Sequence, residues 1–406
     1  MDIRQLLIEA FRKGIRGEKV NWAQLSATEW QELLQLAQRQ HVLPLLVEAT
    51  YDCPAFVALP QTQQRELKMA AVRIGAGQTQ ATARFLQLYT ELAQTGIRYL
   101  VMKGLACRQL YPIPSLRPSA DEDILVSEDD FAACCDFFVQ HGMTTQDDLS
   151  DFECGFHSQD GLYIELHRSP FSPDAHEMGQ SNAYFAAAMS CAMTMDIEGV
   201  TVYTLNEYDH LLYLILHAYK HFIHSGFGIR QVCDIVLWAE QYGKHIDWQQ
   251  LFNQCEEVRC RRFAVAVFQL GQQYLGFQTD RAGIPNGLIG EKTPVDKLLT
   301  DILGGGVYGG EELSRKHSGA VTAAQVRAER SGEKHSLWRT VFPSRASLQS
   351  SYPYLKEHPI LLPVAWCQRL WKYSKELHYH KDSGAGEAIE LSRQRAELFR
   401  ELHIIK

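Results

Sequence analysis

The first 93 residues carry apolar side chains at intervals of three and four positions, with polar residues between them. This spacing is the period of an amphipathic α-helix, whose apolar stripe packs against the rest of a protein. It is clearest in two segments, WQELLQLAQRQHVLPLLVEA and ARFLQLYTELAQTG, the second of which stops at Gly96. The pattern therefore predicts an N-terminal helical region over residues 1–93.

Residues 97–168 show a different pattern, in which short apolar runs alternate with turn residues. Strands are predicted by IRYLVMKG, which ends in Gly104, and by DEDILV. A helical turn and a proline-containing loop separate them, and a helix over SEDDFAACCDFFVQHG follows, capped by Ser127 and ended by Gly142. Two more strands joined by a QDG turn are predicted by FECGFHSQDGLYIELHRS. This order is typical of a small α/β or α+β unit, which we place at residues 94–204.

The helical period returns at Asn206 and continues to about residue 302. It is strongest in NEYDHLLYLILHAYKHFIHSG and GIRQVCDIVLWAEQYG, and EAIELSRQRAELFRELHII predicts a last helix. Residues 311–336 are polar and poor in large apolar side chains, so we expect a mobile loop or an exposed helix there. The expected fold is therefore α+β, with a small mixed sheet between an N-terminal helical region and a C-terminal helical domain at residues 205–406.

The composition is that of an ordinary globular protein. Of the 406 residues, 46% are hydrophobic and 22% are charged, and the formal net charge is −8. A chain with this charge has no overall basic field, so we do not expect it to bind long nucleic acids, although the end of a tRNA stays open.

The chain has no pattern of a membrane or secreted protein. Its longest apolar runs, such as LLYLIL, are far shorter than the roughly 20 residues of a membrane span, and its charged N-terminus does not resemble a signal peptide. The ten cysteines are scattered and include no C-x-x-C pair, so we interpret them as reduced core residues rather than as a zinc site. We therefore expect a cytoplasmic protein.

Two carboxylates one residue apart, Asp121 and Asp123, precede the apolar run of the second strand. Side chains of a strand alternate between faces, so these two point the same way and Glu122 points away. Glu165 interrupts the last apolar strand, where a charged side chain needs a reason. Haloacid-type phosphatases and nucleotide-sugar glycosyltransferases place the strand before their acids. Here the strand follows, and a strand ending in Gly104 lies upstream, which is the order of the nucleotidyltransferase fold.

Three carboxylates that converge at one point favour a divalent cation. Mg²⁺ prefers oxygen ligands and keeps several of its waters, and Mn²⁺ is the other candidate. Two such ions can hold the attacking and leaving oxygens of an in-line phosphoryl displacement. The amides after Gly104 suit phosphate oxygens, and Lys103 and Arg117 supply positive charge for a triphosphate.

The run LVMKGLACRQLYPIPSLRPSADEDILV resembles the signature of the uncharacterised bacterial nucleotidyltransferase family, within the polymerase β-like nucleotidyltransferase superfamily. IELHRS resembles the family's third-acid strand, and HAYKHFIHSGFGIRQVCDIVLWAE resembles its histidine-containing helical element. The likeness extends over about residues 25–405. In one place the chain departs from the superfamily, because Leu105 follows Gly104 where a second glycine or serine is common.

This resemblance implies a transferase that uses a nucleoside triphosphate, most simply ATP, and magnesium. It makes Asp121, Asp123 and Glu165 the catalytic and metal-binding acids. The nucleotide-binding positions that it implies are Lys103, Gly104, Arg117, His167, His217, Lys220, His221 and Arg230, with Asp234 in the same cleft.

Several of these signals keep a second interpretation. His217, His221 and His224 form one stripe of a helix, which is either a face that meets another domain or a zinc site. Arg230 and Asp234 are one helical turn apart and can pair with each other. GGGVYGG at residues 304–310 has the spacing of a dinucleotide loop but lacks the preceding strand and the later acid, so we interpret it as an ordinary loop.

Three functions remain open from the sequence. The first is transfer of a nucleoside monophosphate to a small molecule, a peptide or RNA. The second is a related phosphoryl or sugar transfer onto a biosynthetic product, which would use the same acids. The third is a non-catalytic nucleotide-binding or scaffold protein. An intact set of three acids disfavours the third, because neighbouring carboxylates without a cation repel one another.

Overall fold

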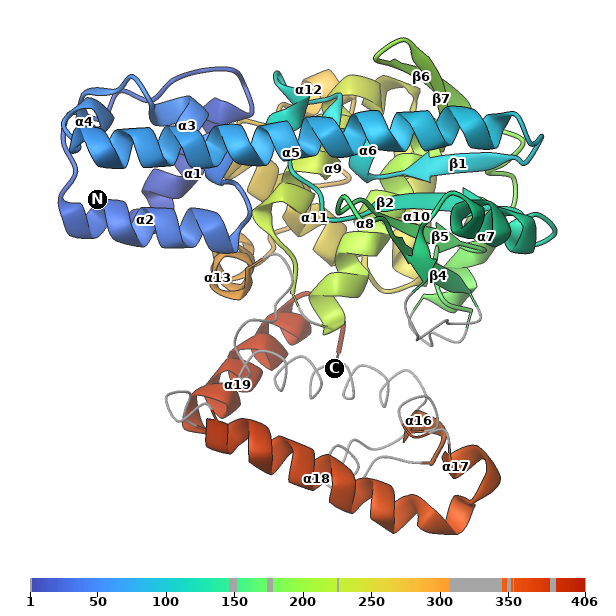
Figure 1. The fold of residues 1–406 in the computed structure, drawn as a ribbon. Coiled ribbons are helices and arrows are strands. Elements are labelled where there is room, and N and C mark those ends of the chain that lie inside the picture. The colour runs from blue at the N-terminus through green and yellow to red at the C-terminus, as the bar shows by residue number, and fades with distance from the viewer. Residues whose placement is uncertain are drawn as a thin grey trace.

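A computed structural model of the protein describes residues 2–145, 152–173, 178–224, 226–306, 345–348, 352, 354–379 and 385–405. The predicted polar segment at residues 311–336 lies outside the described residues. Helical regions surround one seven-stranded sheet, which confirms the expected α+β fold. Figure 1 shows the first four helices at one end of the molecule and the sheet at the other, with the long helix α5 running between them.

The N-terminal helical region contains α1 (Ile3–Gly14), α2 (Ala27–Arg39), α3 (Leu43–Thr50), α4 (Pro54–Val57) and α5 (Gln61–Ala93). Polar residues fix where the first two helices begin. The Asp2 side chain accepts a hydrogen bond from the Arg4 amide, and Ser26 and Glu29 form a reciprocal capping box. The apolar faces of these helices close around Trp30, which is fully buried.

The sheet is mixed and has the strand order β3-β4-β5-β2-β1-β7-β6. Its strands are β1 (Tyr99–Met102), β2 (Glu122–Val126), β3 (Thr144–Thr145), β4 (Glu153–His157), β5 (Tyr163–His167), β6 (Met193–Ile197) and β7 (Val200–Thr204). β2 pairs antiparallel with β1 and parallel with β5. The predicted β4–β5 hairpin is present.

The β6–β7 hairpin was not predicted. Its sequence, MTMDIEGVTVYT, alternates weakly between apolar and polar residues. Its turn is made by Glu198 and Gly199, which both have positive φ angles of 52° and 81°, as a tight hairpin turn requires.

The two faces of the sheet belong to different apolar clusters because side chains alternate along each strand. Val101 and Ile124 pack on the face covered by the end of α5 and by α7 (Phe131–Gln140). Leu100 and Leu125 pack on the other face, in the same cluster as α8 (Glu207–His224) and α9 (Ile229–Tyr242). Asp123 is two residues from Leu125, so it points toward the face that α8 and α9 cover.

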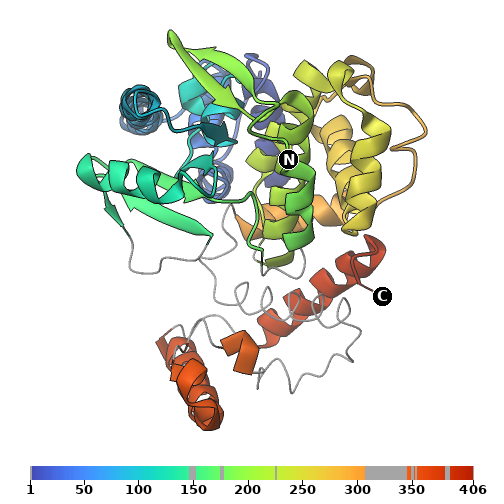
Figure 2. The same cartoon turned by 90° about the vertical axis from the view of Figure 1, so that its right-hand side faces the viewer.

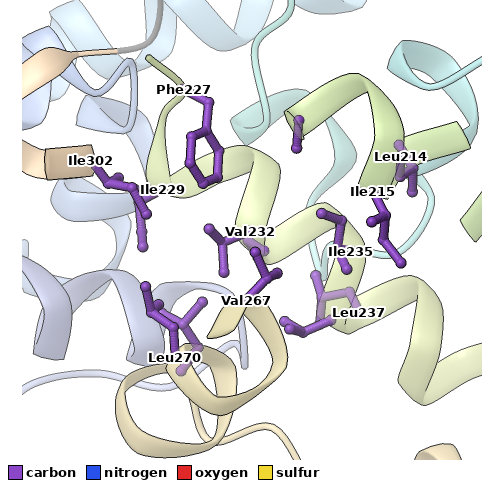
Figure 3. Packing of buried hydrophobic residues seen from close by; sticks show 14 of the residues in the cluster. Leu214, Ile215, Phe227, Ile229, Val232, Ile235, Leu237, Val267, Leu270 and Ile302 are labelled. Carbon is purple, nitrogen blue, oxygen red and sulfur yellow. The ribbon is translucent and has the colours of Figure 1, made fainter. Parts of the chain in front are cut away.

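The described helices after the sheet are α8, α9, α10 (Trp248–Glu257), α11 (Arg261–Leu270), α12 (Thr279–Ala282), α13 (Val295–Gly305), α16 (Arg345–Leu348), α17 (Tyr354–Glu357), α18 (Leu362–Tyr379) and α19 (Ala385–Glu401). Buried residues of α8 to α13 and of α19 belong to the larger core, whereas those of α16, α17 and α18 form a small separate cluster. Figure 3 shows how Ile215 of α8, Val232 and Ile235 of α9 and Val267 of α11 fill the space between these helices.

The last helix braces the helix that carries the histidine stripe. Helix α19 runs back to the body of the molecule, whereas α18 lies at its edge (Figures 1 and 2). Phe399 is fully buried, and the buried Arg395 donates a hydrogen bond to the carbonyl oxygen of Phe222, near the end of α8. Helix α8 is therefore held at its C-terminal end by the end of the chain.

The helix predicted after β2 is confirmed with a small change. Helix α7 begins at Phe131, and Ser127 accepts a hydrogen bond from the Asp130 amide in the turn before it. Most of the cysteines are buried, and none of them forms a disulfide within the described structure. None of the described helices combines the length and the apolarity needed to cross a membrane.

Candidate active site

The candidate acids meet on the face of the sheet that α8 covers. Asp123 in β2 and Glu165 in β5 are Cα partners in the parallel strand pair, so their side chains leave the sheet next to each other. Asp121 stands immediately before β2, on the same side as Asp123. The Asp123 side chain is 1% exposed, the Glu165 side chain 30% and the Asp121 side chain 25%. The Asp123 carboxylate is therefore buried, whereas those of Asp121 and Glu165 are partly exposed to solvent.

Lys103 lies between two of these acids. Its Nζ is 3.0 Å from Asp121 Oδ2 and 3.0 Å from Asp123 Oδ2. Burial alone would lower the pKa of Lys103, but the charges of the two carboxylates outweigh it and raise this pKa well above its ordinary value. Burial opposes ionisation of Asp121 as well, yet the ammonium lowers the pKa of that carboxyl to about 2. Both partners are therefore charged at neutral pH.

His167 holds the same group of acids from the other side. Its Nε2 is 3.1 Å from Asp123 Oδ1 and 3.7 Å from Glu165 Oε2, and its Nδ1 is 3.6 Å from Glu153 Oε2. Burial lowers the pKa of His167, but the interactions with Asp123 and Glu165 outweigh burial and raise this pKa to about 9. The ring therefore acts as a cation that orients both carboxylates.

These residues form a group that fits a metal ion. Asp123, Glu165 and His167 each place one ligand atom within 4.8 Å of the others. Asp123 Oδ2 is buried and has no partner with hydrogen-bond geometry among the described residues, and the cation that it faces is the Lys103 ammonium, 3.0 Å away. Asp121 is not in this group, and its carboxylate accepts a hydrogen bond from Lys103. The sequence placed His167 on the nucleotide side, whereas in the structure its ring contacts the acids.

A pocket adjoins the acids, and Lys103 and Asp121 belong to its wall. Its lining residues are Lys103, Gly104, Arg117, Ser119, Asp121, Leu214, His217, His221, Arg230, Gln231 and Asp234. The cations Lys103, Arg117 and Arg230 and several neutral polar side chains make up most of this wall. Asp123 and Glu165 lie beside it. Most of the residues that the sequence assigned to the nucleotide thus line one pocket.

Arg117 is fixed in the pocket wall by Asp234. Its Nε and Nη2 are 3.2 Å and 2.5 Å from the two carboxylate oxygens of Asp234, and the Tyr111 hydroxyl donates to the same carboxylate at 2.8 Å. Asp234 thus pairs with Arg117, and Arg230, which the sequence also allowed as its partner, donates to the carbonyl oxygen of Pro118. Arg117 Nη1 is buried and has no hydrogen-bond partner within the described chain, so one donor of this guanidinium remains for a ligand.

His217 and His221 form a chain of contacts that starts at Lys103. His217 Nε2 lies 3.4 Å from Lys103 Nζ and 3.3 Å from His221 Nε2. Because an ammonium only donates, His217 Nε2 is an acceptor and its ring is neutral. Burial, followed by the charge of Lys103, lowers the pKa of His217 well below its ordinary value and that of His221 to about 3.

Glu122, on the opposite side of β2, has a structural role. Its carboxylate accepts a hydrogen bond from the Leu105 amide at 3.0 Å and pairs with Arg108 at 2.5 Å, which ties the short helix α6 (Gly104–Arg108) to β2. A Cβ at position 104 would lie 2.5 Å from Glu122 Oε2. Gly104 is therefore required for this close packing. The Leu105 amide, one of those that the sequence suggested for phosphate binding, is already hydrogen-bonded to Glu122.

The structure brings nearly all predicted site residues together, with one exception and some additions. Lys220 is not among the described residues that line the pocket. Sequence reasoning missed Tyr111, Ser119 and Gln231, whose neighbourhood depends on the packing of α9 against the loop before β2. Glu153 could have been found, because the β4–β5 hairpin places it opposite His167.

The metal-ligand group found among the described residues consists of Asp123, Glu165 and His167 and gives no support to the interpretation of the histidine stripe as a zinc site. His217 contacts Lys103 and His221. The arrangement as a whole sets a cluster of acids next to a pocket of cations and neutral imidazoles. Such a pairing of charges suits a metal ion on one side and phosphate groups on the other.

Comparison with known families gives a match to a family model described as an uncharacterised nucleotidyltransferase, over residues 26–276, which is more than half of the chain. All the candidate site residues fall inside this range. A comparison with curated proteins gives no match.

Among solved structures, the crystal structure of an antigenic nucleotidyltransferase-like protein from Paracoccidioides brasiliensis is similar at 14% identity, covering 52% of this chain and 97% of that chain, with a TM-score of 0.34. A TM-score this low supports no inference about the site.

Proposed function

Because this chain belongs to the uncharacterised nucleotidyltransferase family, we propose that it transfers a nucleoside monophosphate from a nucleoside triphosphate to an acceptor, with a divalent cation. The observation that carries the proposal is the pairing of Asp123 with Glu165 on neighbouring strands, beside a pocket lined by Arg117 and Arg230. ATP is the donor that we expect. The acceptor would be a hydroxyl or phosphate on a small molecule, a peptide or RNA.

The cation would be held by the carboxylates of Asp121, Asp123 and Glu165, and we propose Mg²⁺ or Mn²⁺ because these ions prefer oxygen ligands. When bound, it would neutralise phosphate charge and polarise the phosphoryl group that is transferred. His167 would orient Asp123 and Glu165 through the contacts described above.

The phosphates would lie in the adjoining pocket. Arg117 is held by both oxygens of Asp234, so it would present its remaining donor, Nη1, from a fixed position. Arg230 lines the same wall, and Lys103 stands at the boundary between pocket and acids. Such preorganised donors stabilise the charge of a transferring phosphoryl group without having to rearrange.

The neutral histidines would serve the acceptor side. In the proposed reaction an acceptor oxygen bonds to the α-phosphorus, the α–β phosphoanhydride bond breaks, and pyrophosphate leaves. The acceptor hydroxyl loses its proton to solvent water in this step. His217 and His221 are buried and neutral, and pKa values this low make them weak bases, so they would position the acceptor by hydrogen bonding and would not take its proton.

Position-specific labelling tests the proposal. The full-length protein is incubated with Mg²⁺, a pool of small metabolites and ATP labelled on either the α- or the γ-phosphate, and new labelled products are identified by mass. We expect label in an acceptor-derived product only from α-labelled ATP, with the γ label released as pyrophosphate, and loss of that product in Asp123→Asn. The control Asp129→Asn makes the same change of charge at an exposed position and should retain the product.

Transfer of label from the γ-phosphate alone would contradict the proposal and assign phosphoryl transfer to the site. If neither label is transferred to metabolites, peptides or tRNA, while ATP still binds, the protein binds nucleotides without catalysing this reaction.

A further inference from the structure

The Lys103 ammonium occupies the position at which two of the proposed metal ligands converge. It lies 3.0 Å from one carboxylate oxygen of Asp121 and 3.0 Å from one of Asp123. Mg²⁺ binds carboxylate oxygens at about 2.0–2.1 Å. An ammonium and a divalent ion that share these two oxygens would repel each other at short range, so binding of one weakens binding of the other.

The backbone holds Lys103 at this position in an uncommon conformation. Lys103 joins β1 to α6 with a φ of 36°, in the region that residues with a side chain rarely adopt. Gly104 packs directly against Glu122, and the Leu105 amide donates a hydrogen bond to the same carboxylate, which holds the turn against β2. Conformations of this kind persist where the surrounding structure enforces them, and they are concentrated at functional sites.

The same ammonium is already at the edge of the phosphate pocket. Lys103 lines that pocket together with Arg117 and Arg230, and its Nζ is 3.4 Å from His217 Nε2. A change of side-chain torsion would therefore carry the charge from the carboxylates to an entering phosphate without any movement of the strand.

We propose that Lys103 is the built-in counter-ion of Asp121 and Asp123, which excludes free divalent cations and releases the carboxylates only to a cation that arrives with a triphosphate. This inference rests on the proposed function, because it assigns a binding order to the same site. Asp121, Asp123 and Lys103 together carry a charge of −1. A free divalent cation would have to displace the ammonium without offering it a new partner, whereas a metal–triphosphate complex brings phosphate oxygens that bind the ammonium.

Two simpler roles of Lys103 predict different behaviour. If Lys103 only stabilised the fold, its removal would weaken or leave unchanged the binding of a free metal ion. If it only contacted phosphate, its removal would weaken nucleotide binding and would not alter metal binding. Binding of a metal in the absence of nucleotide therefore separates the proposal from both.

The experiment is a titration of the full-length, metal-free protein with Mn²⁺, followed by the electron paramagnetic resonance signal of the unbound ion. Wild type is compared with Lys103→Met, with Lys103→Gln as a second variant and with Lys244→Met, an exposed lysine, as the matched control. We expect Lys103→Met to bind Mn²⁺ at least about tenfold more tightly than wild type, since an opposite charge at this distance shifts a carboxylate equilibrium by that order. Adding Asp121→Asn to Lys103→Met should abolish the gain.

A second readout covers the case in which Lys103→Met is poorly stable. Mn²⁺ should then raise its melting temperature by more than it raises that of wild type, and the same order should hold for Lys103→Gln. Adding ATP together with Mn²⁺ should strengthen metal binding to wild type much more than to Lys103→Met.

The outcomes distinguish this inference from the proposed function. Equal Mn²⁺ affinity of wild type and both Lys103 variants would overturn the role of Lys103, and the proposed function would stand if Mn²⁺ with ATP still bound to wild type. If no protein bound Mn²⁺, with or without ATP, the proposed function would fail and this inference with it.

Discussion

The guanidinium of Arg108 lies 2.5 Å from the carboxylate of Glu122, and both side chains are almost completely buried, at 1% and 3% exposure. Glu122 stands between Asp121 and Asp123 in the chain and points to the opposite side of β2. This ion pair lies on the side of β2 opposite to Asp121 and Asp123, and it therefore fixes the strand that presents these two candidate acids.

Breaking this pair should strongly destabilise the fold. Arg108→Met leaves Glu122 as an uncompensated buried charge, and we expect the free energy of unfolding to fall by about 3–5 kcal/mol. The double variant Arg108→Met/Glu122→Gln should recover a large part of that loss, because no buried charge remains. Urea denaturation of both variants measures the difference. A double variant less stable than Arg108→Met would contradict this account of the pair.

Gly104 should tolerate no side chain, for a packing reason. A Cβ at this position would lie 2.5 Å from Glu122 Oε2 and 3.3 Å from the Asp121 carbonyl oxygen, so we expect Gly104→Ala to lower the free energy of unfolding by about 1–3 kcal/mol. Gly77, in the middle of α5, has nothing within 4 Å of an added Cβ. There the same substitution should stabilise the protein by up to about 1 kcal/mol, from helix propensity. Thermal unfolding of the two variants side by side tests the contrast.

His210 should make the protein less stable in acid. The ring is fully buried against Trp238, with Nδ1 3.1 Å from the Thr204 hydroxyl, and burial lowers its pKa to about 3. Between pH 6.5 and 3 the unfolded chain binds a proton at this residue and the folded chain does not. Stability contributed by the neutral ring is therefore present above about pH 6.5 and is lost as the pH falls.

Between pH 6.5 and 3, protonation of His210 in the unfolded chain lowers the free energy of unfolding by about 1.4 kcal/mol for each unit of pH. The variant His210→Phe keeps the aromatic contact and removes the titration. Denaturation at several values between pH 7 and pH 4 gives the free energy of unfolding of wild type and variant. As the pH falls, this free energy should decrease more steeply for wild type than for the variant. A constant difference between them would show that His210 does not titrate in this way.

Arg395 should matter far more than its neighbour on α19. Arg395 is 1% exposed, with Nη1 3.6 Å from Asp301, and it bonds to the Phe222 carbonyl oxygen of α8. We expect Arg395→Met to cost about 3 kcal/mol or more, because Asp301 then loses a buried partner. Arg393 forms an exposed pair with Glu390, and Arg393→Met should change stability by no more than about 0.5 kcal/mol. Similar losses in the two variants would contradict the bracing role of α19.

The sequence carries enough information to predict the acids of the site, because their signals are local. Asp121 and Asp123 share a strand face by the alternation of side chains, and Glu165 is conspicuous as a charge inside an apolar run. The pairing of Asp123 with Glu165 requires one further fact, the parallel register of β2 with β5, which no local signal in the sequence indicated.

The partners of these residues were harder to predict because they depend on packing between distant segments. Arg117 meets Asp234 across 117 positions of sequence, whereas local spacing offered only a pair of Arg230 and Asp234 as an alternative. Lys103 reaches the acids because β1 and β2 pair antiparallel, with Met102 opposite Asp123. A lysine next to a glycine in the sequence suggested phosphate binding, and no local pattern indicated that its amine lies on the carboxylates.

The measurement that tests the central claim most directly is calorimetric titration of ATP into the protein, with and without Mg²⁺. Wild type is compared with Asp121→Asn/Asp123→Asn and with Asp129→Asn/Asp136→Asn, which removes the same charge from exposed positions of the chain. The account predicts binding to wild type and to the exposed-position control only when Mg²⁺ is present, and no binding to Asp121→Asn/Asp123→Asn. Magnesium-dependent binding that survives in Asp121→Asn/Asp123→Asn would contradict the assignment of these carboxylates to the cation.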